Sequence, residues 1–256
     1  MKKARLTQEK GRGRKIQMNT NGKIPATPNK HKRKKRNPTG IMGYSVHVLY
    51  DGYSKMTDEG MKANCTCTLI KGRKKIIVDT MTPWDKQRII DGLAQHNLSP
   101  DEIDYVVCTH GHSDHIGNNN LFLNAKHIVG FSLSCKDLYY IHPFETGEPY
   151  VIDDDVKVVP TPGHTLADVS VIVNTNEGII AVTGDLFERE EDIAEPYLWQ
   201  HVAGSDEPDL QQQNRNKTLE LADWIVPGHG PMFRVTPQMK KHAEIAMNPS
   251  DNAHYI

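Results

Sequence analysis

Cysteines and long apolar runs are both scarce in this sequence, and each scarcity excludes a class of protein. The chain of 256 residues has four cysteines, too few for the disulfide frameworks that stabilise small secreted domains. We expect all four to be small buried side chains in a reducing compartment. No apolar run approaches the roughly 20 residues that a membrane helix requires. The basic N-terminus also lacks the apolar segment of a secretory signal, so no membrane partner is expected.

The chain as a whole carries almost no net charge, but its two parts carry large charges of opposite sign. The sequence has 31 Lys and Arg residues against 32 Asp and Glu residues. Residues 1–40 hold 14 of the basic residues and a single acid, Glu9, so a strongly basic tail precedes an acidic body. The tail has too few large apolar side chains to offset the entropy of ordering it. We therefore expect residues 1–42 to be disordered and residues 43–256 to form one folded domain.

The tail contains one dense basic run, Lys30 to Arg36. Such a run is typical of a nuclear-import signal or of a surface that binds polyanions. A solvated tail without a function is the equally weighted alternative. The location predicted from the sequence is the cytoplasm, the nucleus or both.

The body alternates predicted strands and helices. Strands are predicted where apolar residues alternate or cluster between turn signals, at residues 44–50, 65–70, 75–79, 104–108, 126–130, 156–159, 169–173, 178–182 and 224–226. Helical spacing predicts helices at residues 84–96, 209–222 and 237–247. Residues 131–150 show neither pattern, and the acidic segment 186–210 is interpreted as a solvated face. The alternation indicates a layered α/β architecture.

The densest group of metal-capable side chains follows the strand predicted at residues 104–108. His110, His112, Asp114 and His115 fall within six positions. We expect Gly111 to let the backbone turn sharply, so that these four side chains face one space. Imidazole and carboxylate together suit zinc, iron or manganese. A solvated and inert loop is the alternative, although four potential ligands at this spacing make it the weaker interpretation.

Four more metal-capable side chains stand where a predicted strand ends: Asp79, His164, Asp185 and His229. Each of the last three follows a glycine, which frees the backbone. Corresponding ends of neighbouring strands converge in space, so these positions and residues 110–115 predict one site along one edge of the sheets. Taken alone, Asp79 is equally compatible with capping a turn, and His164 with an ordinary turn position.

The order of these motifs resembles the metallo-beta-lactamase superfamily, and the resemblance covers residues 44 to about 235. It implies an αββα sandwich, with residues 43–256 as the catalytic domain. It also implies two divalent metal ions, with Zn²⁺ expected first and Fe or Mn as alternatives. The resemblance assigns the first metal to His110, His112 and His164. It assigns the second metal to Asp114, His115 and His229, with Asp185 bridging both metals and Asp79 supporting the histidine cluster.

The chemistry follows from this ligand set. Two divalent metals about 3.5 Å apart can share a hydroxide and lower the pKa of its parent water toward neutrality. The expected nucleophile is therefore solvent rather than a Ser or Cys side chain. Asp114 is the candidate catalytic residue, because it is placed to accept a proton during the attack. No proton donor for the leaving group is evident, and His142 and His201 are expected to be structural or exposed.

The lengths of two segments exclude two branches of the superfamily and so limit the possible substrates. The segment between Asp185 and His229 is too short for the domain inserted in the RNA-cleaving beta-CASP members. The segment after His229 is too short for the helical domain with which glyoxalase II enzymes hold glutathione. The domain is similar to stand-alone members of the superfamily, which implies a dizinc endoribonuclease for histone pre-mRNA 3′ ends, in cytosol and nucleus. That resemblance implies RNA as the substrate and a homodimer as the assembly.

Two other functions stay open. The acidic body should repel phosphates, and no motif combines aromatic with basic residues, although the basic tail can offset this by contacting phosphates. A thioester or lactone hydrolase of the glyoxalase-II-like type, acting on a small-molecule ester or thioester, needs no phosphate-binding surface. A non-catalytic metal-binding scaffold is the second alternative, and the complete ligand set argues against it.

Overall fold

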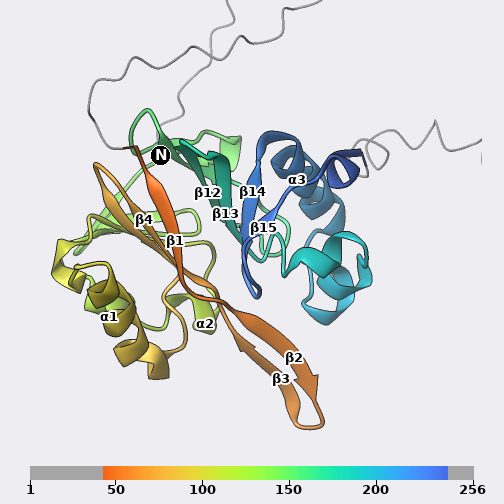
Figure 1. Cartoon of the computed structure of the whole chain (residues 1–256), viewed down its shortest axis with the longest axis horizontal. Coiled ribbons are helices and arrows are strands. Elements are labelled where there is room, and N and C mark those ends of the chain that lie inside the picture. Colours follow the sequence, from red (N-terminus) through yellow and green to blue (C-terminus); the bar gives the residue numbers. More distant parts are fainter. Residues whose placement is uncertain (1–42, 242–256) are drawn as a thin grey trace, which may run out of the picture. The chain divides into compact units, whose positions relative to one another are not determined.

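Two β-sheets pack face to face, and a helix covers the outer face of each (Figure 1). The computed structural model describes residues 43–241. The first sheet contains, in spatial order, β1 (Ser45–Tyr50), β4 (Cys67–Lys71), β5 (Lys75–Val78), β6 (Tyr105–Cys108), β7 (Lys126–Val129), β8 (Ser132–Cys135) and β9 (Leu138–Tyr140). The second contains β10 (Tyr150–Val151), β11 (Val156–Pro160), β12 (Val169–Thr175), β13 (Gly178–Gly184), β14 (Trp224–Pro227) and β15 (Phe233–Arg234). The αββα sandwich expected from the sequence is confirmed.

The remaining elements are a separate hairpin and the helices. The hairpin pairs β2 (Tyr53–Thr57) with β3 (Gly60–Asn64). The α-helices are α1 (Lys86–Gln95), α2 (Ser113–Ile116) and α3 (Pro208–Leu221). Short helical turns are η1 (Pro83–Asp85), η2 (Pro100–Glu102), η3 (Asn119–Leu121), η4 (Phe144–Thr146), η5 (Glu190–Ile193) and the π-helical η6 (Leu198–Val202). Residues 237–241 are helical as well.

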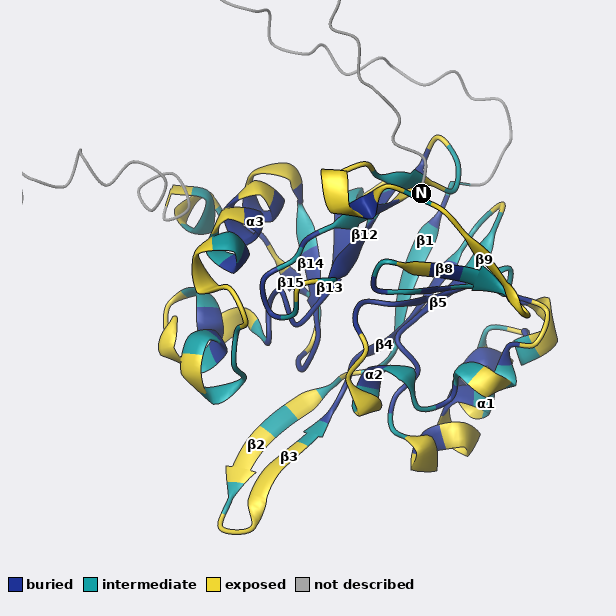
Figure 2. Ribbon diagram, turned by 180° about the vertical axis from the view of Figure 1, so that it is seen from behind, coloured by how far each residue is buried: buried dark blue, intermediate teal, exposed yellow. Residues whose placement is uncertain are grey.

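The central strands are buried on both faces, because each sheet lies between the other sheet and a helix layer. Along β5, Ile76 and Val78 point into the core between the sheets, whereas Ile77 packs in the layer beneath α1. Along β13, Val182 joins the core between the sheets and Ala181 packs toward α3. Successive side chains of a strand alternate between its faces, so apolar runs fill two layers at once. Figure 2 shows these strands buried and the β2–β3 hairpin largely exposed.

Parallel pairing brings four of the site segments to one edge. β5, β6 and β7 run parallel to one another in the first sheet, and β13 runs parallel to β14 in the second. The carboxyl ends of parallel strands lie at the same edge of a sheet. Asp79 follows β5, residues 109–115 follow β6, Asp185 follows β13 and His229 lies just after β14. The fold therefore gathers the candidate site residues before any side-chain interaction is considered.

Two sequence-based expectations about loops are wrong. Residues 131–150, predicted to be irregular, contain β8 and β9 and the start of β10. These strands have only two to four residues, too few to show the alternation on which the prediction depends. The β2–β3 hairpin was also not predicted, because its exposed residues form no apolar pattern.

The acidic segment 186–210 is not uniformly solvated, which corrects a further expectation. Glu188 and Asp192 are buried. Asp192 accepts hydrogen bonds from the Arg215 guanidinium and, at 2.7 Å, from the backbone N–H of Glu188. The guanidinium lies 4.2 Å from the ring centre of Phe187 and 4.8 Å from that of Trp199. A buried ion pair thus joins α3 to the segment that follows Asp185.

Several expectations lie outside the described residues. They are the disordered tail at residues 1–42 with the basic run Lys30 to Arg36, and the last part of the helix predicted at 237–247. Within residues 43–241, every helix is too short or too polar to cross a membrane. Cys65, Cys67 and Cys108 are buried, as expected, and Cys135 is partly exposed.

Replacing Asp192 with Asn should destabilise the folded state by about 3–5 kcal/mol, because a buried Arg215 charge would lose its partner. Urea denaturation measures this free energy of unfolding. Glu191→Gln, which changes the exposed neighbouring residue, is the matched control and should change it by less than about 0.5 kcal/mol. Equal stability of the two variants would contradict a structural role for the pair.

Candidate metal centre

Four side chains from three segments surround one point at the edge of the two sheets. His110 and His112 come from the loop after β6, His164 from the loop after β11, and Asp185 directly follows β13. His112 Nδ1 lies 2.8 Å from His110 Nε2 and 3.2 Å from His164 Nε2. Asp185 Oδ2 lies 3.6 Å and 3.3 Å from the same two Nε2 atoms. Ligands held tetrahedrally by zinc at about 2.0–2.1 Å lie about 3.3–3.4 Å apart, so this spacing suits one cation.

A second group adjoins the first and contains Asp114, His115 and His229. His115 Nε2 lies 3.3 Å from Asp185 Oδ1, and His229 Nε2 lies 3.3 Å from Asp185 Oδ2. Asp114 Oδ2 is 4.0 Å from His115 Nε2 and 3.8 Å from His229 Nε2. Asp185 therefore borders both groups. The structure brings all seven predicted ligands together in the two sets that the sequence suggested, and their binding of metal stays a prediction.

Unpartnered buried atoms indicate what this arrangement is built to hold. Asp114 Oδ2, His115 Nε2 and Asp185 Oδ1 are buried and have no hydrogen-bond partner among the described residues. Leaving a polar atom buried without a partner costs about 1–3 kcal/mol, and more for a charged group. The three atoms face one another across the space between the two groups. The donor set therefore fits divalent cations, which would complete the interactions of all three atoms.

In His164 and His229, the ring nitrogen that points away from the two groups faces backbone carbonyls. His164 Nδ1 lies 2.9 Å from the carbonyl of Gly204, and His229 Nδ1 lies 3.2 Å and 3.1 Å from the carbonyls of Tyr53 and Asn64. A carbonyl only accepts, so each Nδ1 carries a proton, and Nε2 is the nitrogen left to bind a metal. The carbonyls thus select the tautomer that a metal requires.

Asp79 does the same for His115. Its carboxylate accepts from His115 Nδ1 at 2.9 Å, from the Thr109 backbone N–H at 2.8 Å and from the Thr109 hydroxyl at 3.0 Å. Asp79 itself has a φ of 58°, a conformation that Asp and Asn tolerate better than most residues. These contacts place Asp79 behind His115 and also fix the start of the loop that carries His110, and its support of a metal site stays a prediction.

Comparisons with known proteins agree with this geometry. The sequence profile described as "Metallo-beta-lactamase superfamily" matches residues 61–229. The chain belongs to the metallo-beta-lactamase superfamily. A relative from Xenopus laevis, "Metallo-beta-lactamase domain-containing protein 1", is 41% identical over 82% of this chain and 88% of its own length. The chain is thus a metal-dependent hydrolase by family and by its His and Asp cluster.

Solved structures of the superfamily share the fold. A structure from Thermotoga maritima described as a "putative metallo-beta-lactamase" superimposes with a TM-score of 0.57 at 22% identity, over 75% of this chain and 99% of its own. An N-acyl homoserine lactone hydrolase, with its product bound at the catalytic metal centre, gives a TM-score of 0.51 at 17% identity, over 74% of this chain and 93% of its own. Both likenesses concern the fold alone.

Of the four glycines predicted at the site, three leave no room for a side chain and one does. A Cβ on Gly228 would overlap the Asp185 carboxylate. A Cβ on Gly163, whose φ is 152°, would overlap the Cα of Gln211 on α3. A Cβ on Gly184, whose φ is 52°, would overlap the side chain of Thr109. At Gly111 the chain bends after β6 as expected, but glycine is not required there, because its φ is not in the left-handed region and a Cβ would meet nothing.

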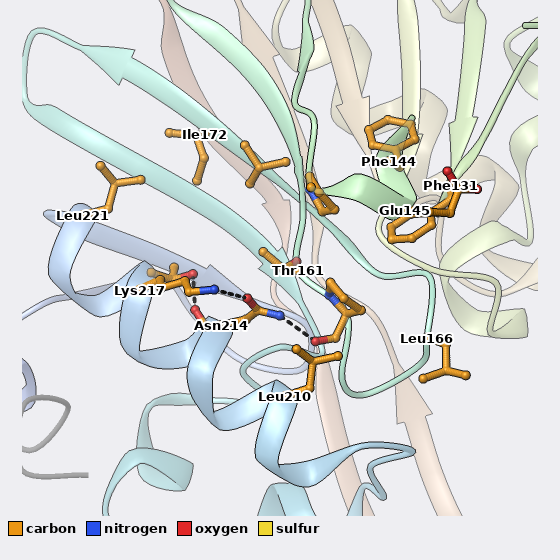
Figure 3. Close-up of a pocket in the computed structure, with 15 residues that line it drawn as sticks. Phe131, Phe144, Glu145, Thr161, Leu166, Ile172, Leu210, Asn214, Lys217 and Leu221 are labelled. Atoms are coloured by element: carbon orange, nitrogen blue, oxygen red, sulfur yellow. Dashed lines mark hydrogen bonds between the residues drawn. The ribbon is translucent and has the colours of Figure 1, made fainter. Parts of the chain in front are cut away.

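Helix α3 positions two of the metal-facing loops, and the sequence analysis missed this. Asn214 Nδ2 donates to the carbonyl of Pro162 at 2.7 Å, two residues before His164 (Figure 3). Gln211 Nε2 donates to the carbonyl of Asp185 at 3.0 Å. The available signal was the spacing of polar residues at positions 211, 214, 215 and 218, which places them on one helix face.

Burial and charge oppose each other around Asp185. Burial would raise the pKa of this carboxyl, but the adjacent His229, His115 and His110 outweigh it and hold the pKa well below its usual range. Burial would likewise lower the pKa of His229, but Asp185 raises it to about 9. Burial lowers the pKa of His110 well below its ordinary value. An ionised carboxylate and a neutral imidazole are the forms that bind metal. Asp185 and His110 are therefore already in those forms, whereas His229 must release a proton when a metal binds.

One further carboxylate lies beside the second group. Glu188 is buried, and its Oε2 accepts from the Ser54 hydroxyl of the hairpin at 2.9 Å. Burial, with Asp185 nearby, raises the pKa of Glu188 to about 7. Its side chain is close enough to Asp185 and His229 to share a cation with them. The acidic run around Glu188 predicted a solvated face, since nothing in its local pattern marks burial.

The variant Asp79→Asn should lower zinc affinity by about 10- to 100-fold, as expected when a partner of a metal-binding histidine is lost. Asn keeps the shape and tolerates the backbone conformation, but it presents an N–H group to one of its former donors. Competition with a fluorescent chelator measures the affinity. Asp91→Asn, on the exposed surface of α1, is the control. Unchanged affinity in Asp79→Asn would show that this carboxylate does not support the site.

Proposed function

We propose that this protein is a dinuclear zinc hydrolase that cleaves phosphodiester bonds in RNA. The observation that supports two metals is the position of Asp185 between the two groups. Its Oδ2 lies 3.3 Å from His164 Nε2 in the first group and 3.3 Å from His229 Nε2 in the second. A carboxylate in this place offsets the charge of two cations at once. Zinc suits the dominance of imidazole in the donor set.

In such a reaction, different residues of the site would bind the cations and accept the proton. When bound, two divalent cations would polarise the reacting oxygen and lower the pKa of a water molecule. His110, His112 and His164 would hold one cation, while His115, His229 and Asp114 would hold the other. Asp114 is the least enclosed of these carboxylates, with 17% of its side chain exposed against 4% for Asp185. That exposure places Asp114 where it can accept a proton from attacking solvent and return it to solvent.

RNA is proposed as the substrate because of the resemblance to stand-alone members of the superfamily and because of the basic tail. Contacts from Lys and Arg to phosphates give affinity that does not depend on base sequence. Fourteen basic residues within residues 1–40 are enough to offset the acidic body. The homodimer and the cytoplasmic or nuclear location also stay predictions.

A lactone or thioester hydrolase is the second candidate. The observation that favours it is the acidic body, which disfavours a polyanionic substrate. The lactone hydrolase among the solved structures holds its product at its own metal centre, and this likeness of fold supports the candidate. A non-catalytic scaffold is the third candidate and is opposed by the complete donor set.

Asp185→Asn should lose the second metal and most of the activity, because the neutral amide no longer offsets two cations. Elemental analysis of the purified variant measures the metal content, with Asp206→Asn, an exposed substitution, as the control. Two metals per chain in Asp185→Asn would exclude the bridging role. Two metals in the unaltered protein, with no turnover of ester or phosphodiester substrates, would instead favour the scaffold.

Salt should distinguish the two enzymatic candidates. Cleavage of an RNA oligonucleotide is expected to lose at least tenfold in kcat/KM between 50 and 200 mM salt, because several phosphate contacts are screened. Hydrolysis of an uncharged lactone or thioester should change little over the same range. Removal of residues 1–42 should flatten the salt dependence for RNA and leave ester hydrolysis unchanged. Efficient lactone turnover with no RNA cleavage at any salt concentration would overturn the RNA assignment.

A further inference from the structure

A cavity of about 660 Å³ lies between α3 and the strands β11 and β12 (Figure 3). It is separate from the metal centre, because the His164 loop contributes Leu166 to the cavity, whereas His164 Nε2 faces Asp185. Sites for small molecules in proteins typically enclose about 300–1,000 Å³. The cavity is therefore large enough for a ligand of its own, and none of the predicted metal ligands lines it.

The walls of the cavity are mostly apolar. Phe131 and Phe144 stack with their ring centres 5.5 Å apart and form one end. Ile172 of β12 and Leu210 of α3 line it further along. Leu166 faces the cavity yet is 61% exposed. Apolar side chains left open to water in a concave site gain from covering by an apolar ligand.

The main cationic group in the lining is Lys217 of α3. Its Nζ lies 3.4 Å from Asn214 Oδ1, a long contact with a neutral group, and it forms no ion pair with a carboxylate of residues 43–241. The amide of Asn214 is already committed, because its Nδ2 donates to the Pro162 carbonyl at 2.7 Å. Glu145 lines the cavity near Phe131 and Phe144, away from Lys217 (Figure 3). The two ends of the cavity thus differ in charge.

We propose that this cavity binds an amphipathic monocarboxylate, a molecule with one apolar chain and one anionic head group. The chain lies along Ile172, Leu210 and the two phenylalanines. The head group pairs with the Lys217 ammonium, which offers donors that no carboxylate of the described residues uses. The opposite orientation is disfavoured, because it would place the anion beside Glu145. This assignment is independent of the reaction at the metal centre.

Isothermal titration calorimetry of the zinc-loaded full-length protein tests the proposal, with decanoate as the probe and decan-1-ol as its uncharged counterpart. Lys217→Met should weaken decanoate binding by about tenfold or more, since a charge-assisted hydrogen bond is lost, and leave decan-1-ol binding unchanged. Leu210→Trp should narrow the cavity and weaken the binding of both compounds. Lys157→Met, which removes an exposed lysine from β11, is the matched control and should bind as the unaltered protein does.

Three results would overturn the proposal. The first is the absence of saturable decanoate binding. The second is unchanged decanoate affinity in Lys217→Met, which would place the carboxylate elsewhere, such as on bound zinc. The third is a dimer in light scattering that Leu221→Glu converts to a monomer, because the apolar wall would then be covered by a second copy of the chain. Zinc content measured in every variant keeps a damaged metal centre distinguishable from a lost cavity.

Discussion

The buried carboxylate of Asp185 is the charge around which the site is arranged. An ionised group that is 4% exposed is costly to bury unless nearby groups compensate for the water it has lost. Imidazole nitrogens of His110, His164, His115 and His229 lie 3.3–3.6 Å from its two oxygens. Two of these imidazoles, His110 and His115, come from the loop after β6. The other two come from the loops after β11 and β14. The Asp185 carboxylate is therefore contacted from three loops, those that follow β6, β11 and β14.

Backbone carbonyls and one more carboxylate complete that arrangement from outside. They bind the far nitrogen of His164, His229 and His115 and so determine which nitrogen faces inward. Two of the carbonyls belong to Tyr53 and Asn64, at the base of the β2–β3 hairpin. A hairpin that looks peripheral is in this way joined to the centre. Metal-capable side chains, their tautomers and the surrounding loops form one connected structure.

The ends of the strands could be predicted from the sequence, and the contacts between loops could not. Site residues could be predicted where they follow an apolar run, because runs of this kind become neighbouring strands. These are His110 to His115, His164, Asp185 and His229. Glu188 and Asp192 were misplaced, because their burial depends on Arg215 and Ser54, which lie far away in the chain. Very short strands such as β9 could not be predicted for a different reason. Three residues are too few to show the alternation that distinguishes a strand from a loop.

Helix α3 carries its polar residues on the side that faces the protein. Gln211, Asn214, Arg215 and Thr218 are buried there, and the first three bind loop carbonyls that adjoin His164 and Asp185. A designer who idealised this helix by giving its inner face leucines would improve its intrinsic amphipathicity. The same change would release the loops that it holds and would leave the buried Asp192 without its Arg215 partner, so the order of the centre would be lost and the fold would not gain stability.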